Sequence, residues 1–314
     1  MCILAIAVEV HPDWPLVIAH NRDEAWDRCT DPPQAHDGVI YARDAVAGGT
    51  WMGLNGANGA FAALNNVRSS APRPAGGPSR GALVLHALER PGDQTAAVAA
   101  QYSAFSLWHG SAFPGGSAPQ VTRSRFRSRP DDAGPEEEGA WVADTLPVAA
   151  GEVSAHSNEG DARCGEAPWA KSRHLRTGVA SLLATLPAGS SAEELRDSLG
   201  ALLSESLDDG ALAALGGTAP HPASSLAEWQ EAVLQRGPLV SRRACREAAQ
   251  AHGVDDYAYG TSSQTVLLSS ARERCAFFFQ RSVQNPEQAA GEWEAWTVPW
   301  PDAAQLGEKE GKVP

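Results

Sequence analysis

The residue with the clearest chemical potential is Cys2, the second residue of the chain. Methionine aminopeptidase removes Met1 efficiently when the next side chain is small, so we expect the mature chain to begin with Cys2. An N-terminal cysteine combines a thiol with a free α-amino group, whose reference pKa of about 7.7–8.0 lets it act as a base near neutral pH. The alternative is that Cys2 is a small hydrophobic residue at the start of a buried strand.

A run of hydrogen-bonding side chains, Asn-Arg-Asp-Glu, follows at residues 21–24. Apolar runs at residues 2–10 and 16–19, separated by a turn at residues 11–15, predict an antiparallel hairpin. Such a hairpin brings residue 2 opposite roughly residues 20 to 24, so that Arg22 and a carboxylate could contact the thiolate and the α-amine. A helix cap or surface salt bridges are the other interpretations of this run.

Elements further along the chain must position these groups. Glycine and asparagine turns near residues 48–53 and 55–59 bracket short strands, and a strand over residues 60–64 ends at Asn65-Asn66. From Ser79 the apolar residues recur at the spacing of a helix, which ends before Pro91-Gly92.

Two capping boxes predict helices in the second half of the chain, and strand character returns near the end. The boxes pair Ser191 with Glu194 and Ser225 with Glu228, and the strands cover residues 265–268 and 275–279. Strands first, helices next and strands last predict one α+β domain closed by pairing its ends. We expect this single domain over residues 1–304, with a flexible loop at 112–139 and a polar tail at 305–314. Within that loop, arginines at alternating positions 123 to 129 are typical of a solvated hairpin and loop, and an anion-binding site is the alternative.

Composition excludes several classes of protein. With 25 Lys+Arg against 38 Asp+Glu, the chain is expected to repel phosphate backbones, so we expect no nucleic-acid partner. The five cysteines include no CxxC pair, which argues against a disulfide framework and a structural zinc site and favours a reducing, cytoplasmic location. The apolar runs are too short to span a membrane, and residues 1–10 lack the basic start of a secretory signal. Nucleotide-binding glycine loops and metal-binding motifs are absent, so we expect neither a cofactor nor a metal.

Six motifs occur in an order that resembles the NRDE family, the family of transport and Golgi organisation protein 2. They are Met1-Cys2, Asn-Arg-Asp-Glu at 21–24, Gly-Gly-Thr-Trp-Met-Gly at 48–53, Ala-Leu-Asn-Asn-Val-Arg at 63–68, Ser-Arg-Gly at 79–81 and Tyr-Gly-Thr at 259–261. The resemblance implies an N-terminal-nucleophile hydrolase fold, which is a four-layer αββα sandwich. Within that superfamily, the pattern of an N-terminal cysteine, an arginine and an aspartate after the first hairpin, and two later asparagines resembles the branch that contains bile-salt hydrolase and penicillin V acylase.

This resemblance implies a set of catalytic residues. Cys2 is then the nucleophile, its own amine is the general base, and Arg22 and Asp23 orient and ionise the pair. Asn66 corresponds to an asparagine that can donate a side-chain N–H to an oxyanion. Asn158 resembles the family's second asparagine, followed by Pro-Trp-Ala-Lys at 168–171.

Further side chains are expected to contact substrate. Asn65 stands where the family usually has threonine, and it is a second candidate for the oxyanion role of Asn66. Ser262 stands where the family commonly has arginine, which removes a planar anion-binding group. Without the resemblance, turn capping at strand ends explains these asparagines and Ser262. The complete set of expected substrate-binding residues is Asn21, Glu24, Asn65, Trp51 and Ser262.

The function expected on this basis is hydrolysis of a non-peptide C–N bond in a small amide, or acyl transfer. A second hypothesis is a non-enzymatic protein that binds and transports haem, or a lipid or acyl-CoA. Ten tryptophans could line an apolar pocket for such ligands. There is no CxxCH motif and no obvious axial His–Met pair, and His20 is only a weak candidate for a haem ligand. A third possibility is a degenerate fold kept for protein interactions.

Overall fold

A computed structural model describes residues 2–67, 77–92, 101–113, 119–128, 141–158, 169–217, 225–254, 258–283 and 290–301. Cys164 and the expected polar tail at 305–314 lie outside these residues. Two antiparallel sheets and several helices make up the described chain, which confirms the α+β class. No helix in these ranges is both long and apolar enough to cross a membrane.

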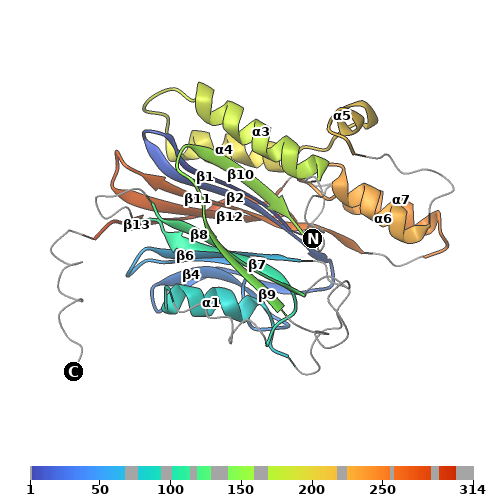
Figure 1. Ribbon diagram of the computed structural model, residues 1–314, viewed down its shortest axis with the longest axis horizontal. Coiled ribbons are helices and arrows are strands. Elements are labelled where there is room, and N and C mark those ends of the chain that lie inside the picture. Colours follow the sequence, from blue (N-terminus) through green and yellow to red (C-terminus); the bar gives the residue numbers. More distant parts are fainter. Residues whose placement is uncertain are drawn as a thin grey trace.

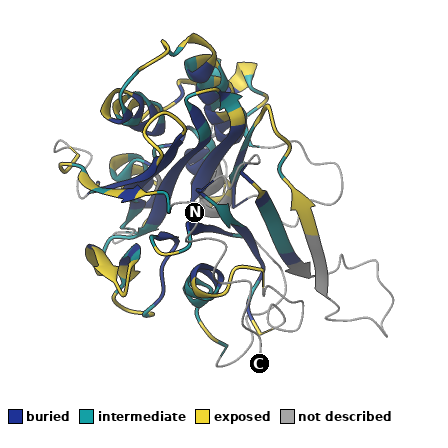
Figure 2. Cartoon of the chain, turned by 90° about the vertical axis from the view of Figure 1, so that its left-hand side faces the viewer, coloured by how far each residue is buried: buried dark blue, intermediate teal, exposed yellow. Residues whose placement is uncertain are grey.

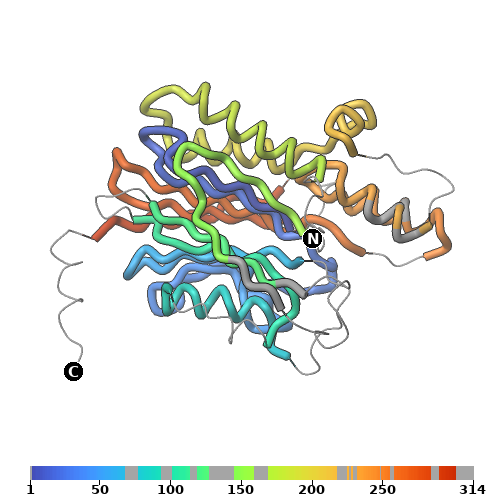
Figure 3. The backbone as a smooth tube through the Cα atoms, viewed as in Figure 1, coloured from blue at the N-terminus to red at the C-terminus, as the bar shows by residue number. Residues whose placement is uncertain are grey.

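The first sheet has six strands in the order β10-β1-β2-β11-β12-β13. Its strands are β1 (Ile3–His11), β2 (Trp14–Ala25), β10 (Glu152–Ser157), β11 (Tyr259–Ser270), β12 (Cys275–Ser282) and β13 (Glu294–Pro299). The predicted hairpin is confirmed, because β1 pairs with β2 and Ile3 lies opposite Asn21. The predicted pairing of the chain ends is confirmed as well, because β11 pairs with β2. Figure 3 shows the blue N-terminal hairpin beside the orange C-terminal strands.

The second sheet has seven strands, which follow one another in chain order from β3 to β9. They are β3 (Thr30–His36), β4 (Val39–Asp44), β5 (Met52–Asn55), β6 (Ala60–Asn66), β7 (Phe105–Ser111), β8 (Val121–Ser128) and β9 (Trp141–Pro147). The loop expected at 112–139 is therefore interrupted by β8, which pairs with β7 and β9. Strand pairing of residues 121–128 explains why arginines alternate there. Residues 114–118 and 129–140 lie outside the described ranges.

Helices cover the outer faces of both sheets (Figure 1). The described helices are α1 (Gly81–Glu89), α3 (Ala170–Thr185), α4 (Ala192–Leu203), α5 (Asp209–Ala214), α6 (Leu226–Gln235) and α7 (Arg242–Gln250). Helices α3 and α4 contact the six-stranded sheet, and α1 contacts β5 and β6 of the seven-stranded sheet. Both predicted capping boxes are present at the starts of α4 and α6.

Alternation along β1 assigns its side chains to two different cores. Side chains of a strand point to opposite faces of the sheet at every second residue. In β1, Leu4 and Ile6 pack between the sheets with Met52 and other residues of the second sheet. Ile3, in contrast, packs on the opposite face with residues of α3 and α4. Figure 2 shows that the buried residues concentrate in the stacked strands. This alternation decides which polar groups meet at the N-terminal end of β1.

Candidate active site

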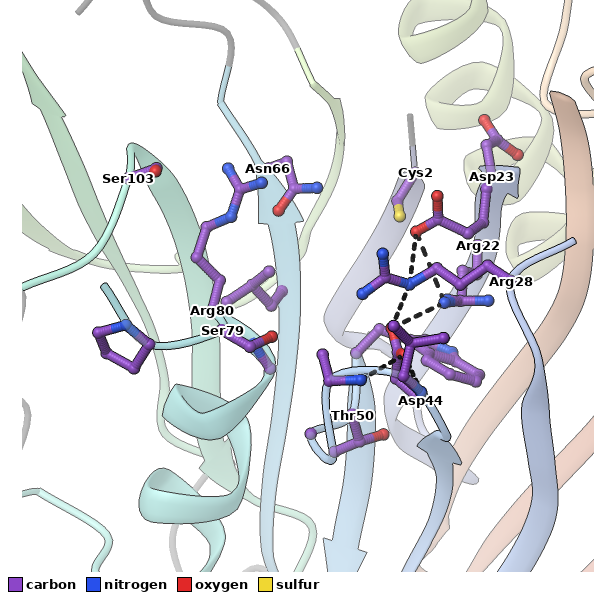
Figure 4. A pocket seen from close by; sticks show the side chains of 18 residues that line it. Cys2, Arg22, Asp23, Arg28, Asp44, Thr50, Asn66, Ser79, Arg80 and Ser103 are labelled. Carbon is purple, nitrogen blue, oxygen red and sulfur yellow. Dashed lines mark hydrogen bonds and ion pairs between the residues drawn. The ribbon is translucent and has the colours of Figure 1, made fainter. Parts of the chain in front are cut away.

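A cavity of about 480 Å³ lies where β1 begins and β2 approaches its end. One wall contains Cys2, which lies just before β1, Arg22 near the end of β2 and Asp44 at the end of β4. The end of β6 and the segment that starts α1 form the other wall, with Asn66 and Arg80. Figure 4 shows these two groups facing each other across the cavity.

The register of the β1–β2 hairpin explains why Cys2 and Arg22 share one wall. Ile3 pairs with Asn21, so continuing the ladder by one residue places Cys2 level with Arg22. Directly opposite residues of an antiparallel pair point to the same face of the sheet. Both side chains therefore face the second sheet, where Arg22 contacts Thr30 and Asp44.

Arg22 is only 3% exposed, and its guanidinium is held by contacts on several sides. Its Nη2 lies 3.1 Å from the Oδ2 atom of Asp44, and its guanidinium carbon lies 4.4 Å from the ring centre of Trp51. Its Nη1 donates to the hydroxyl of Ser262 at 3.3 Å, and that hydroxyl donates to the backbone carbonyl of Arg22 at 3.1 Å. A guanidinium fixed by an ion pair, a ring and a hydroxyl is pre-oriented, as a catalytic site requires.

Asp44 links Arg22 to a second arginine. Arg28 donates from Nε to the same carboxylate oxygen at 2.7 Å, and Glu24 lies 3.5 Å from Arg22 and 3.6 Å from Arg28. Partial burial acts to raise the pKa of Asp44, but the hydrogen bond and charge of Arg28 and the charge of Arg22 hold it below the ordinary value. The carboxylate is therefore ionised at neutral pH.

Asp23 points to the other face of β2, away from Arg22 (Figure 4). Its Oδ1 accepts a hydrogen bond of 2.7 Å from Thr261, and its Oδ2 lies 3.6 Å from the Nζ of Lys171. Its backbone carbonyl accepts from the hydroxyl of Tyr259 at 3.0 Å. The Tyr-Gly-Thr motif at 259–261 therefore anchors Asp23, both at its backbone and at its side chain.

Cys2 is 7% exposed and lines the cavity. Its backbone carbonyl accepts a hydrogen bond of 2.8 Å from the hydroxyl of Ser157 in β10. Burial raises the pKa of the thiol above its ordinary value, and the carboxylate of Asp23 acts in the same direction. The backbone N–H of Asp23 and the charge of Arg22 oppose this rise. In this state Cys2 is a thiol at neutral pH, so a nearby base is needed to make it a nucleophile.

Six of the residues expected at the site line the cavity: Cys2, Arg22, Asp23, Glu24, Trp51 and Asn66. The carboxylate of Asp23 is turned away from it, toward Thr261 and Lys171. The other four, Asn21, Asn65, Asn158 and Ser262, are not among its lining residues.

Three of these four residues do not line the cavity because their side chains contact other parts of the fold. Asn21 faces the helices, where its Nδ2 donates to the carbonyls of Leu203 and Pro238 at 2.8 Å each. Asn65 faces away from Asn66 on β6 and donates to the carbonyl of His156 at 2.8 Å. Ser262 lies where the pairing of β11 with β2 shifts register, and it contacts Arg22 instead of the cavity.

Asn158 follows the last residue of β10. Because Ser157 pairs with Ile3, the same register places Asn158 level with Cys2 on the opposite side of β1 from Arg22. Its side chain is buried, and its Oδ1 has no hydrogen-bond partner in the described part of the chain. It is thus adjacent to Cys2 in the sheet without lining the cavity.

Sequence reasoning assigned no role to Arg28 and Asp44, although both line the cavity. Arg28 follows Glu24 by four residues, a spacing that also suits a surface helix pair. Asp44 is brought to the site by the pairing of β4 with β3, in which it lies opposite Thr30. No local signal near residue 44 predicts this pairing.

The described residues contain no group of His, Cys, Asp or Glu side chains that could hold a metal ion. His20, the candidate haem ligand, is fully buried and does not line the cavity. Burial lowers the pKa of His20 to about 3, so its ring is neutral.

Comparison with known families shows where the chain belongs. The family model for Transport and Golgi organisation 2 matches residues 1–285, which is most of the chain. No curated protein matches the chain. The chain therefore belongs to the Transport and Golgi organisation 2 family, as its ordered motifs predicted.

Proposed function

We propose that this member of the family is an N-terminal cysteine hydrolase or acyltransferase that acts on the C–N bond of a small amide. The observation that carries the proposal is the position of Cys2: the residue exposed by removal of Met1 lines a cavity, with Arg22 beside it. The proposal includes the N-terminal-nucleophile type of four-layer αββα sandwich and a single domain over residues 1–304. Two sheets that pack face to face, with helices on their outer faces, support this fold type.

The reaction uses two groups of one residue. The α-amine of processed Cys2 accepts the thiol proton, and the thiolate attacks the amide carbonyl to form a tetrahedral adduct. The side-chain N–H of Asn66 and backbone N–H groups stabilise its oxyanion. The C–N bond then breaks as the α-ammonium returns a proton to the leaving amine. Water attacks the resulting thioester and releases the acid, or a second amine takes the acyl group.

The cavity wall favours a polar substrate. Arg22, Arg28, Glu24, Asp44 and Arg80 all line it, so a ligand that enters meets charged groups on both sides. Haem or an acyl chain needs an apolar wall to bury its surface. The cavity therefore supports the amide substrate over the haem or lipid ligand.

The first experiment is to determine the N-terminus by mass spectrometry and to label the protein with iodoacetamide. We expect a chain that begins at Cys2 and that turns over members of an amide and ester panel. Cys2→Ala and Cys2→Ser keep a small second residue and so keep removal of Met1, but we expect both to lose turnover. Cys29→Ala is the matched control, because Cys29 is an exposed thiol outside the cavity lining.

Two outcomes contradict the proposal. Retention of Met1 in the purified protein removes the base, and equal turnover by Cys2→Ala and wild type removes the nucleophile. A haem titration tests the alternative, because a Soret shift that saturates at one equivalent in Cys2→Ala protein favours a binding protein.

A further inference from the structure

The ion pair between Asp23 and Lys171 is buried completely. Both side chains have 0% relative exposure, and the Nζ of Lys171 lies 3.6 Å from the Oδ2 of Asp23. Lys171 is the second residue of α3, and Asp23 lies in β2, so the pair joins the helix layer to the strand beside Cys2.

Such a pair is an expensive way to hold a helix on a sheet. Removing two charges from water costs several kcal/mol per ion, and an apolar pair of similar volume is often as stable or more stable. The position of Lys171 adds to the cost, because the positive end of the helix dipole lies at the N-terminus of α3. The pair is thus better explained by a need for charge at this point than by stability.

The charge that the pair maintains is that of Asp23. Burial acts to protonate this carboxylate and raises its pKa, while the charge of Lys171 and the hydroxyl of Thr261 act in the opposite direction. The titratable groups that face it are Lys171 from α3, the ammonium at the start of the chain, the thiol of Cys245 from α7 and the thiol of Cys2 just before β1. From β11, Thr261 donates to the carboxylate and Tyr259 donates to the backbone carbonyl. Among the charged groups that oppose protonation of Asp23, Lys171 has the largest effect.

Asp23 acts directly on the environment of Cys2. Its negative charge raises the pKa of the Cys2 thiol, and its backbone N–H lowers it. When the thiol transfers its proton to the α-amine, the product is an ammonium beside a thiolate. A carboxylate in this position stabilises the ammonium, whereas a protonated Asp23 does not.

We propose that Lys171 is a positioning residue whose ammonium keeps Asp23 ionised, so that Asp23 can stabilise the α-ammonium formed when the Cys2 thiol gives up its proton. The inference rests on the proposed function, and it adds a residue that touches neither the substrate nor the thiol. In this role Lys171 acts through Asp23.

The test is the pH profile of kcat/KM for Lys171→Met, which removes the charge and keeps the length of the side chain. Loss of Lys171 raises the pKa of Asp23, so the acidic limb moves to higher pH. We expect a loss of about tenfold or more near pH 6 and a much smaller loss near pH 9, since one pH unit corresponds to tenfold. Thr261→Val removes the hydroxyl that donates to Asp23 and should shift the limb in the same direction by less.

Two controls separate this role from a purely structural one. His174 lies on the same helix as Lys171 and contacts Glu205. His174→Gln removes this contact and should leave the acidic limb of the pH profile in place. In an Asp23→Asn background, Lys171→Met should cause no further change in kcat/KM, because its target is already neutral. The double variant buries neither charge. It can therefore still be measured if Lys171→Met alone does not fold because Asp23 is left without its cation.

Infrared difference spectra between each protein and its Asp23→Asn counterpart report the ionisation of Asp23 without any turnover. We expect a carboxylate in wild type at neutral pH and a carboxylic acid in Lys171→Met. A carboxylate in both proteins, or an unmoved acidic limb with Cys2-dependent turnover intact, overturns the inference alone. A wild type without Cys2-dependent turnover overturns the proposed function, and the role of Lys171 in the reaction fails with it.

Discussion

Replacement of Asn21 by alanine distinguishes a residue that binds substrate from one that joins two parts of the fold. Asn21 belongs to the family motif beside Cys2, and the resemblance implied a contact with substrate. In the structure it is fully buried, and its Nδ2 donates to the carbonyls of Leu203, at the end of α4, and Pro238. One amide group thus fastens β2 to the end of a helix and to the chain that follows α6.

The expected cost follows from these two bonds. Each hydrogen bond contributes about 1 kcal/mol net, and each buried carbonyl left without a partner adds roughly 1–3 kcal/mol unless water reaches it. We therefore expect Asn21→Ala to lower the free energy of unfolding by about 3 kcal/mol or more. An unfolding entropy of about 2.1 cal/mol/K per residue gives roughly 1.5 °C per kcal/mol for a chain of 314 residues, so Tm falls by about 4–5 °C or more.

The assay is urea unfolding followed by tryptophan fluorescence, combined with steady-state kinetics below the unfolding transition. Asn65→Ala serves as the matched control, because Asn65 donates to a single carbonyl, that of His156. It should cost about half as much as Asn21→Ala. If Asn21→Ala keeps the urea midpoint of wild type and instead raises KM, Asn21 binds substrate and the structural role is refuted.

The N-terminal hairpin could be predicted from sequence because its signals are local. Two apolar runs and a proline-containing turn fix which residues pair, and the observed register places residue 2 within the expected range. The capping boxes at Ser191 and Ser225 were predictable for the same reason, since each is a reciprocal contact over three residues.

Other elements carry no such signal. Helix α3 has Trp169 at its N-cap with no side-chain cap, and Gly178 lies in its middle, so neither its start nor its length follows from local sequence. Strand β3 contains Pro32 and Pro33, which argue against a strand, but β3 lies at the edge of its sheet, where proline is tolerated.

The site was only partly predictable because a cluster in sequence is not a cluster in space. In the run 21–24, Arg22 faces the cavity whereas Asn21 and the carboxylate of Asp23 face the helices. Strand alternation imposes this division, but it is visible only once β2 is known to extend to Ala25. The partners Asp44 and Lys171 arrive from a different sheet and from a helix, so their contacts depend on long-range packing.

Two further substitutions test the scaffold of the site. Gly59→Ala should destabilise the fold by about 2 kcal/mol or more, because Gly59 has a φ of +72° and an added Cβ meets the ring of Phe113. A variant whose thermal unfolding equals that of wild type contradicts this expectation. Asp44→Asn tests the ion pairs of the cavity wall. The pKa of Asp44 is lower in the folded protein than its ordinary value of 3.8, so its charge stabilises the fold above that value, and the stabilisation is lost as pH falls through the lower folded pKa. We therefore expect Asp44→Asn to be less stable than wild type at pH 7 and the difference to shrink below about pH 4 in urea unfolding at a series of pH values. If the difference in unfolding free energy stays constant down to pH 3, the ion pairs of Asp44 with Arg22 and Arg28 do not stabilise the fold.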